Sequence, residues 1–215
     1  MNLRRALLAA GFVISMASSA YAERGAVTAD LSWGVALINV RAPYAQGAPS
    51  QVGSSFTTLL GIRYALTNSV EVGAAAFYQL PTTFTHADAQ VPSPGGMLPG
   101  TLSERTQQVG VLLRGRFVHG FTWRLIAGGD VGFASRSFSN IAHYDVSDPA
   151  TGPRSYGLSL ADTSQKALLL APSAGVEWAG DHFTIGLAPR VEFLLGTVRT
   201  WSLSLPLSIS WSWYL

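Results

Sequence analysis

The last stretch of the chain, residues 200–215, alternates strictly between apolar and small polar side chains. It reads TWSLSLPLSISWSWYL, and one parity is wholly apolar: Trp201, Leu203, Leu205, Leu207, Ile209, Trp211, Trp213 and Leu215. The other parity is serine, interrupted by Pro206. Because strand side chains point alternately to opposite faces, this pattern predicts a β-strand with one apolar face, whereas a helical period would mix the two sets. Trp at both ends of that face is typical of a strand that contacts lipid.

The first 22 residues are predicted to be a signal peptide. Arg4 and Arg5 precede a short apolar segment, Ala6–Met16, and Ala20-Tyr21-Ala22 has the small-x-small form of a cleavage site. The apolar segment is too short to span a bilayer. Two of the 14 basic residues and none of the 12 acidic ones lie in the signal, so the mature domain, residues 23–215, is near neutral. Its charge gives no reason to expect a nucleic-acid partner.

Beyond the signal, no apolar run approaches the length of a membrane helix, although 48% of the chain is hydrophobic and only 12% is charged. An exported chain of this kind is either a water-soluble β-sandwich or an outer-membrane β-barrel. The chain has no cysteine, which excludes disulfides, thiolate metal sites and cysteine nucleophiles.

Seven further segments alternate in the same way: Ala26–Val40, Ser54–Leu66, Val70–Leu80, Arg105–Val118, Phe121–Phe138, Ser164–Ala179 and His182–Leu195. Long polar loops are expected at Arg41–Gly53, Pro81–Glu104 and Ser139–Thr163, and short turns elsewhere. The pattern predicts an all-β fold, an eight-stranded antiparallel up-and-down transmembrane barrel with both termini in the periplasm. The first and last strands would pair and leave no edge. Three prolines inside predicted strands, Pro172, Pro189 and Pro206, are expected to mark bulges, and the alternative is that some strands are shorter than these segments.

Aromatic residues on the outward parity are predicted to form two membrane-interface belts. The belt near the short turns would contain Trp33, Tyr64, Phe117, Trp123, Trp178, Phe183 and Trp213. The belt near the long loops would contain Phe56, Tyr78, Phe133, Phe193 and Trp201. A sandwich core has no reason to sort aromatic residues by height, so this arrangement favours the membrane barrel.

The inward parity collects charged residues of both signs. The acidic ones are Asp30, Glu71, Asp130, Glu177 and Glu192, and the basic ones are Arg63, Arg114, Arg116, Arg124 and Arg190. An eight-stranded barrel is just wide enough for its own side chains to fill it, so buried charges must be paired. The planar guanidinium of Arg suits such pairing. The favoured interpretation is a salt-bridged plug of the lumen, and the alternative is an ion path.

The segment GIRYALTNSVEVGAAAFY, from Gly61 to Tyr78, resembles the hairpins of the small bacterial outer-membrane barrels, the eight-stranded OmpA/OmpX-like group. This resemblance implies the fold, a place in the bacterial outer membrane, and contact with outer-membrane lipid and lipopolysaccharide. The final strand resembles the C-terminal signal read by the outer-membrane insertion machinery, although it ends in Leu215 rather than the usual Phe or Trp.

The long loops are expected to be the external working surface, with recognition candidates His86, His143, Tyr144 and Tyr156. The favoured function is non-enzymatic: envelope structure, or recognition of an unknown external ligand. The alternatives are a narrow pore for ions or small solutes and a lipid-modifying enzyme. A His–Ser–Asp set could be assembled around His143, but its spacing does not match the His-x-Ser pattern of outer-membrane deacylases. Two His–Asp pairs do not make a metal site, and no catalytic residue, metal or cofactor is expected.

Overall fold

The computed structural model describes residues 24–40, 50–93, 96–140, 144–148, 152–156, 162–196 and 200–214. Its strands are β1 (Ala26–Val40), β2 (Gln51–Ala65), β3 (Val70–Ser93), β4 (Gly96–Gly120), β5 (Trp123–Asn140), β6 (Tyr144–Asp148), β7 (Gly152–Tyr156), β8 (Thr163–Ala179), β9 (Phe183–Leu187), β10 (Arg190–Leu195) and β11 (Thr200–Tyr214). The predicted signal peptide lies outside the described residues. Within them, no helix has the length and hydropathy needed to cross a membrane.

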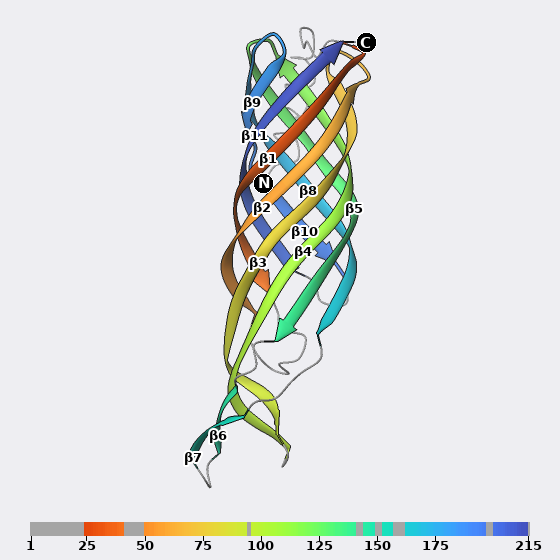
Figure 1. Cartoon of the computed structure of the whole chain (residues 1–215). Coiled ribbons are helices and arrows are strands. Elements are labelled where there is room, and N and C mark those ends of the chain that lie inside the picture. The colour runs from red at the N-terminus through yellow and green to blue at the C-terminus, as the bar shows by residue number, and fades with distance from the viewer. Residues whose placement is uncertain are drawn as a thin grey trace, which may run out of the picture.

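The strands form a closed antiparallel ring (Figure 1). From β1 to β5 each strand pairs with the next, and β5 pairs with β8. β9 and β10 both lie between β8 and β11, and they act as one interrupted strand. β1 pairs with β11 from Ala26↔Tyr214 to Ile38↔Ser202. The predicted eight-stranded barrel and its closure between the first and last segments are therefore confirmed.

The outer and inner faces of the wall follow the alternation in the sequence. Outside, Leu113 and Phe133 are 67% and 70% exposed, whereas the inward-facing Leu112 and Leu59 are 2% and 1% exposed. Apolar side chains therefore cover the outside of the barrel and also fill part of its interior.

The aromatic residues predicted for the two belts have the outward parity of their strands, but Trp33 is not at the predicted height. Trp33 is the middle residue of β1, and it pairs with Thr58 and Leu207, the middle residues of β2 and β11. Trp33 thus lies halfway up the wall, and its assignment to the belt near the short turns is wrong. Parity fixes which face a residue occupies, whereas its height depends on the tilt and register of the strands.

The segment expected to be a loop at Pro81–Glu104 is instead a continuation of β3 and β4. The two strands stay paired as far as Ser93↔Gly96, with irregularities between Gln79 and Thr82 and between His86 and Ala89. Within the expected loop Ser139–Thr163, β6 and β7 pair with each other, and β6 joins β4 at Gly100 and Thr101. These four strands extend beyond one end of the barrel as an outer sheet (Figure 1).

The three prolines do not produce the predicted bulges. Pro172 pairs with Gly129, and Pro206 pairs with Gly34, in ladders whose register does not change. Pro189 interrupts the strand between β9 and β10, but both pieces keep the same register against β11. The missing N–H is tolerated as a local gap in the ladder, so no extra residue has to be inserted.

Candidate functional site

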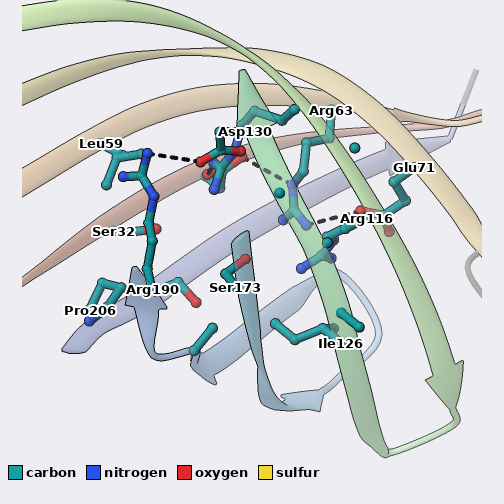
Figure 2. A pocket seen from close by; sticks show the side chains of 18 of the residues that line it. Ser32, Leu59, Arg63, Glu71, Arg116, Ile126, Asp130, Ser173, Arg190 and Pro206 are labelled. Atoms are coloured by element: carbon teal, nitrogen blue, oxygen red, sulfur yellow. Dashed lines mark hydrogen bonds and ion pairs between the residues drawn. The ribbon is translucent and has the colours of Figure 1, made fainter. Parts of the chain in front are cut away.

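Ten inward charged side chains form one continuous chain of alternating sign inside the barrel, and Figure 2 shows its central part. Within it, each side chain except the two at the ends lies within ion-pair distance of two partners of opposite charge. The order is Arg124, Glu177, Arg116, Glu71, Arg63, Asp30, Arg114, Asp130, Arg190 and Glu192. These are the residues singled out from the inward parity, and we call this set the charge network.

The centre of the charge network has its shortest contacts. Arg63 donates through Nε to Asp30 Oδ1 at 3.0 Å and through Nη1 to Glu71 Oε2 at 2.9 Å. Arg114 Nη1 donates to the other oxygen of Asp30 at 2.6 Å. Arg116 Nε donates to Glu71 Oε2 at 2.6 Å. Each central carboxylate is therefore shared by two guanidinium groups, which offsets the cost of removing these charges from water.

The charge network also joins the strands of the ring. Its members lie on β1, β2, β3, β4, β5, β8 and β10, and Arg63 Nη2 donates to Ser210 Oγ on β11 at 3.0 Å. Gly61 makes room at the centre, because a Cβ there would lie 3.0 Å from Asp30 Oδ1 and 3.2 Å from Arg114 Nη1. The absence of a side chain at Gly61 thus leaves the space that Asp30 and Arg114 occupy.

Arg190 is held less directly than the other arginines. Its Nη1 and Nη2 lie 3.0 Å from Glu192 Oε1 and 3.2 Å from Asp130 Oδ2, but none of its side-chain nitrogens makes a well-aligned hydrogen bond. The guanidinium lies over the Phe77 ring, 5.4 Å from its centroid. Charge attraction and a cation–π contact therefore hold Arg190, whereas the terminal Glu192 also accepts a hydrogen bond from Ser202 Oγ at 2.9 Å.

A cavity of about 60 Å³ lies within the charge network, lined also by small residues such as Gly129, Ser173 and Ser208 (Figure 2). This volume accommodates a few water molecules. It is too small for a nutrient-sized solute.

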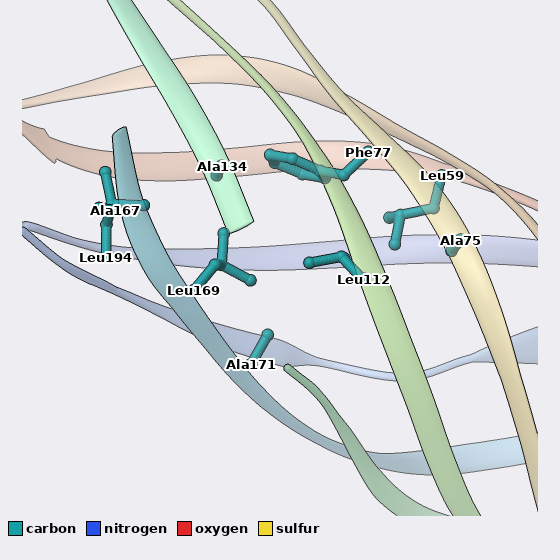
Figure 3. Close-up of a cluster of buried hydrophobic side chains, with 9 residues drawn as sticks. All are labelled: Leu59, Ala75, Phe77, Leu112, Ala134, Ala167, Leu169, Ala171 and Leu194. Atoms are coloured by element: carbon teal, nitrogen blue, oxygen red, sulfur yellow. The ribbon is translucent and has the colours of Figure 1, made fainter. Parts of the chain in front are cut away.

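Apolar side chains fill the lumen beside the charge network (Figure 3). This apolar layer consists of Leu59, Ala75, Phe77, Leu112, Ala134, Ala167, Leu169, Ala171 and Leu194. Nearer the outer sheet, a second buried cluster contains Ala36, Ile38, Val40, Phe84 and Phe138. Neither layer was predicted from the charged inward positions, although large apolar residues with inward parity, such as Leu59 and Leu112, indicate them in the sequence.

A further group of polar side chains, centred on Arg136, is buried in this half of the barrel. Arg136 donates to Gln108 Oε1 through Nε at 3.0 Å and through Nη2 at 2.6 Å, and its Nη1 donates to Thr200 Oγ1 at 2.7 Å. Sequence reasoning did not single out Arg136, although it has the inward parity of β5.

The recognition candidates in the long loops have different outcomes. His86 is fully buried, with Nε2 3.1 Å from Glu104 Oε1, so the expectation that it is an exposed recognition residue is wrong. It lies on the inner face of β3, because the strand continues through the predicted loop. Tyr144 and Tyr156 pair with each other across β6 and β7, and His143 lies outside the described residues. No three His, Asp or Glu side chains in the described segments are arranged to hold a metal ion.

The closed ring and its filled, salt-bridged interior define a small β-barrel of the outer-membrane type. No protein-family model matches the chain, and no curated protein matches it. Among solved structures, it is similar to Neisserial surface protein A, with 10% identity, a TM-score of 0.50, and coverage of 88% of this chain and 100% of that one. It is also similar to Ail, the attachment invasion locus protein of Yersinia pestis, with 14% identity, a TM-score of 0.49, and coverage of 87% and 99%. At these identities the likeness concerns the fold.

Proposed function

We propose that the protein is a non-enzymatic barrel of a bacterial outer membrane that presents its outer sheet to the outside of the cell. The observation that carries the membrane location is the outer face of the wall. Leu60 on β2 and Val111 and Leu113 on β4 are each more than three-fifths exposed, and the strand between them, β3, carries only alanine at the positions paired with Leu60 and Leu113. A water-soluble protein rarely exposes a continuous apolar surface of this kind, whereas lipid covers it in a barrel. The short turns and the termini would then face the periplasm.

The location is tested with the purified mature chain. We expect it to fold only with detergent or lipid, and to migrate differently on SDS gels before and after boiling, because a closed barrel resists detergent unfolding. A chain that stays folded and monomeric in buffer alone would refute the membrane assignment.

The interior supports a plugged lumen rather than a pore. The described part of the lumen holds the charge network, the apolar layer and the second apolar cluster in succession, and the cavity in the network is about 60 Å³. An ion leaving the network toward the outer sheet would have to displace packed side chains, the apolar ones of both clusters and the polar group around Arg136. We therefore expect the reconstituted barrel to hold planar bilayers at baseline conductance. Steady single-channel currents from the unmodified chain would favour the pore.

The outer sheet is the part of the protein best placed to meet an external ligand. β3 and β4 run 24 and 25 residues, whereas about 9–11 residues are enough to cross a bilayer. The excess, joined by β6 and β7, forms a continuous sheet rather than separate loops. Bacteria that display the full chain should bind an immobilised array of host glycans and matrix proteins, and a variant with residues 87–101 replaced by a two-residue turn should not. Equal binding by both would refute recognition through the outer sheet.

The enzyme hypothesis receives no support from His86, because burial beside Glu104 keeps it away from a lipid substrate. Its remaining candidate is His143, which lies outside the described residues.

A further inference from the structure

Most of the basic side chains that the structure describes are used inside the barrel. Arg63, Arg114, Arg116, Arg124 and Arg190 belong to the charge network, and Arg136 is bound by Gln108 and Thr200. Arg105 and Lys166 differ, because both are exposed on the outer face and neither pairs with a carboxylate of the described residues. A cation on the outside of the wall does nothing for the packing of the interior, so its position needs another explanation.

The registers place these two cations in one compact surface grid on β4, β5 and β8. Three rows run across the strands: Arg105–Ser139–Asp162, Gln107–Ser137–Ser164 and Val109–Ser135–Lys166, where the β5–β8 pairing is continued by one residue to reach Asp162. We call the polar members of this grid the polar patch. Ser139 Oγ donates to the carbonyl of Arg105 at 3.4 Å. Within the described residues, Ser135, Ser137 and Ser164 have no side-chain partner, so their hydroxyls are available.

The height of the polar patch is set by the next row of the same grid. That row is Val111–Phe133–Leu168, with Phe133 70% exposed, and it belongs to the exposed apolar side chains of the outer face, which we call the apolar belt. The polar patch therefore begins directly above the edge of the belt, on the side of the outer sheet. In a membrane this is the level at which acyl chains end and headgroups begin.

We propose that the polar patch binds the phosphorylated sugar headgroup of lipopolysaccharide in the outer leaflet. With standard strand spacing and rise, the Cα atoms of Arg105 and Lys166 are about 16 Å apart, which suits two separated anionic groups on one broad headgroup. The hydroxyls of Ser135, Ser137 and Ser164 lie between them and match sugar hydroxyls. Asp162 lies at the corner of the grid next to Ser164, on the side of the outer sheet. It would therefore meet the sugar region rather than the phosphates. A phospholipid with a single phosphate would use one of the two cations.

This inference rests on the proposed membrane location and orientation. The hydroxyl character continues on the outward face of β3 and β4, where Thr85 and Ser103 are hydrogen-bonded to each other at 3.1 Å. That face would lie along the polysaccharide beyond the headgroup. The outer sheet and the polar patch would then contact different parts of the cell surface.

The test uses the full mature barrel in detergent and purified lipopolysaccharide as the probe. An Arg105→Gln, Lys166→Gln double variant should bind lipopolysaccharide about 25-fold more weakly, since each basic residue near an anionic membrane surface contributes about fivefold. Arg24→Gln is the matched control. Arg24 is also an exposed cation, but it lies just before the start of β1, at the short-turn end of the barrel and away from the polar patch. Dephosphorylated lipopolysaccharide should bind all variants as weakly as the double variant binds the native lipid.

Unchanged binding by the double variant, an equal loss in Arg24→Gln, or equally effective competition by phosphatidylglycerol would each overturn the proposal. Heat-dependent gel mobility is recorded for every variant. If the barrels fold normally while lipopolysaccharide binding ignores the polar patch, only the proposed lipid site is refuted. If the native chain never forms a detergent-resistant barrel, the proposed membrane function itself is refuted.

Discussion

Replacing Asp30 by Asn should destabilise the barrel more than changing any residue at the end of the charge network. Asp30 is shared by Arg63 and Arg114, and its side chain is 3% exposed. The substitution keeps the shape of the side chain but leaves the network with one excess positive charge. Removing one partner of a buried ion pair costs about 3–5 kcal/mol when the other partner is left alone. Because Arg63 keeps Glu71 and Arg114 keeps Asp130, we expect the lower end of that range, about 3 kcal/mol.

The comparison variant is Arg124→Gln, at the end of the same network. Arg124 Nη1 lies 3.6 Å from Glu177 Oε1, and its side chain is 19% exposed. A partly exposed, long ion pair is worth about 1 kcal/mol or less. Asp162→Asn is a matched control for Asp30→Asn, because Asp162 is exposed and outside the network. It should leave the free energy of unfolding unchanged.

The free energy of unfolding is measured by reversible urea titration of the barrel in lipid vesicles, followed by tryptophan fluorescence. The predicted order of loss is Asp30→Asn, then Arg124→Gln, then Asp162→Asn. Equal losses for Asp30→Asn and Arg124→Gln would refute the argument that sharing by two guanidinium groups makes the centre of the network decisive. A loss below about 1 kcal/mol for Asp30→Asn would show that water already screens the network.

Three further outcomes are expected. Neutralising Arg114 or Asp130 by Gln or Asn should leave planar bilayers at baseline conductance, because the apolar layer still closes the lumen; currents that change with either residue would favour a pore. His86→Ala should increase protease cleavage of the outer sheet in the reconstituted barrel, because it leaves Glu104 buried without its partner, and an unchanged cleavage pattern would contradict that role. His143→Ala should leave the lipid A of the host membrane unchanged by mass spectrometry, and loss of a modification would establish the enzyme hypothesis instead.

Strand parity was enough to predict the barrel and the members of the charge network. A two-residue period can be recognised from local sequence alone. In a closed ring, a charged side chain of the inward parity must lie in the lumen. Parity could not predict which charges meet. Arg63 contacts Glu71, which is eight residues away in the sequence. Arg190 on β10 contacts Asp130 on β5, which is far away in the sequence. Both contacts depend on the register of the strands. The same dependence explains Trp33, whose face was right and whose height was wrong.

The outer sheet was missed for a different physical reason. Pro81 and the prolines and glycines of the VPSPGG segment favour turns. This signal predicted a loop, although Phe84, His86 and Leu102 show a weaker strand-like alternation. The structure tolerates Pro81 near an irregularity between Gln79 and Thr82, after which inward positions resume at Phe84 and His86. Because such irregularities absorb residues that cannot continue a regular ladder, Pro- and Gly-rich sequence does not by itself end a long hairpin.

The interior links the stability of the outer sheet to the closure of the lumen. Phe84 on β3 packs in the second apolar cluster with Ile38 and Phe138, at the base of the sheet, and His86 meets Glu104 on the neighbouring strand. The side chains that fasten the hairpin are therefore among those that block the lumen beyond the charge network. Widening the barrel enough to pass solutes at this level would require removing that packing, which would free the sheet to move. A conducting lumen and a rigid outer sheet are thus competing uses of the same buried residues, and the packing favours the rigid sheet.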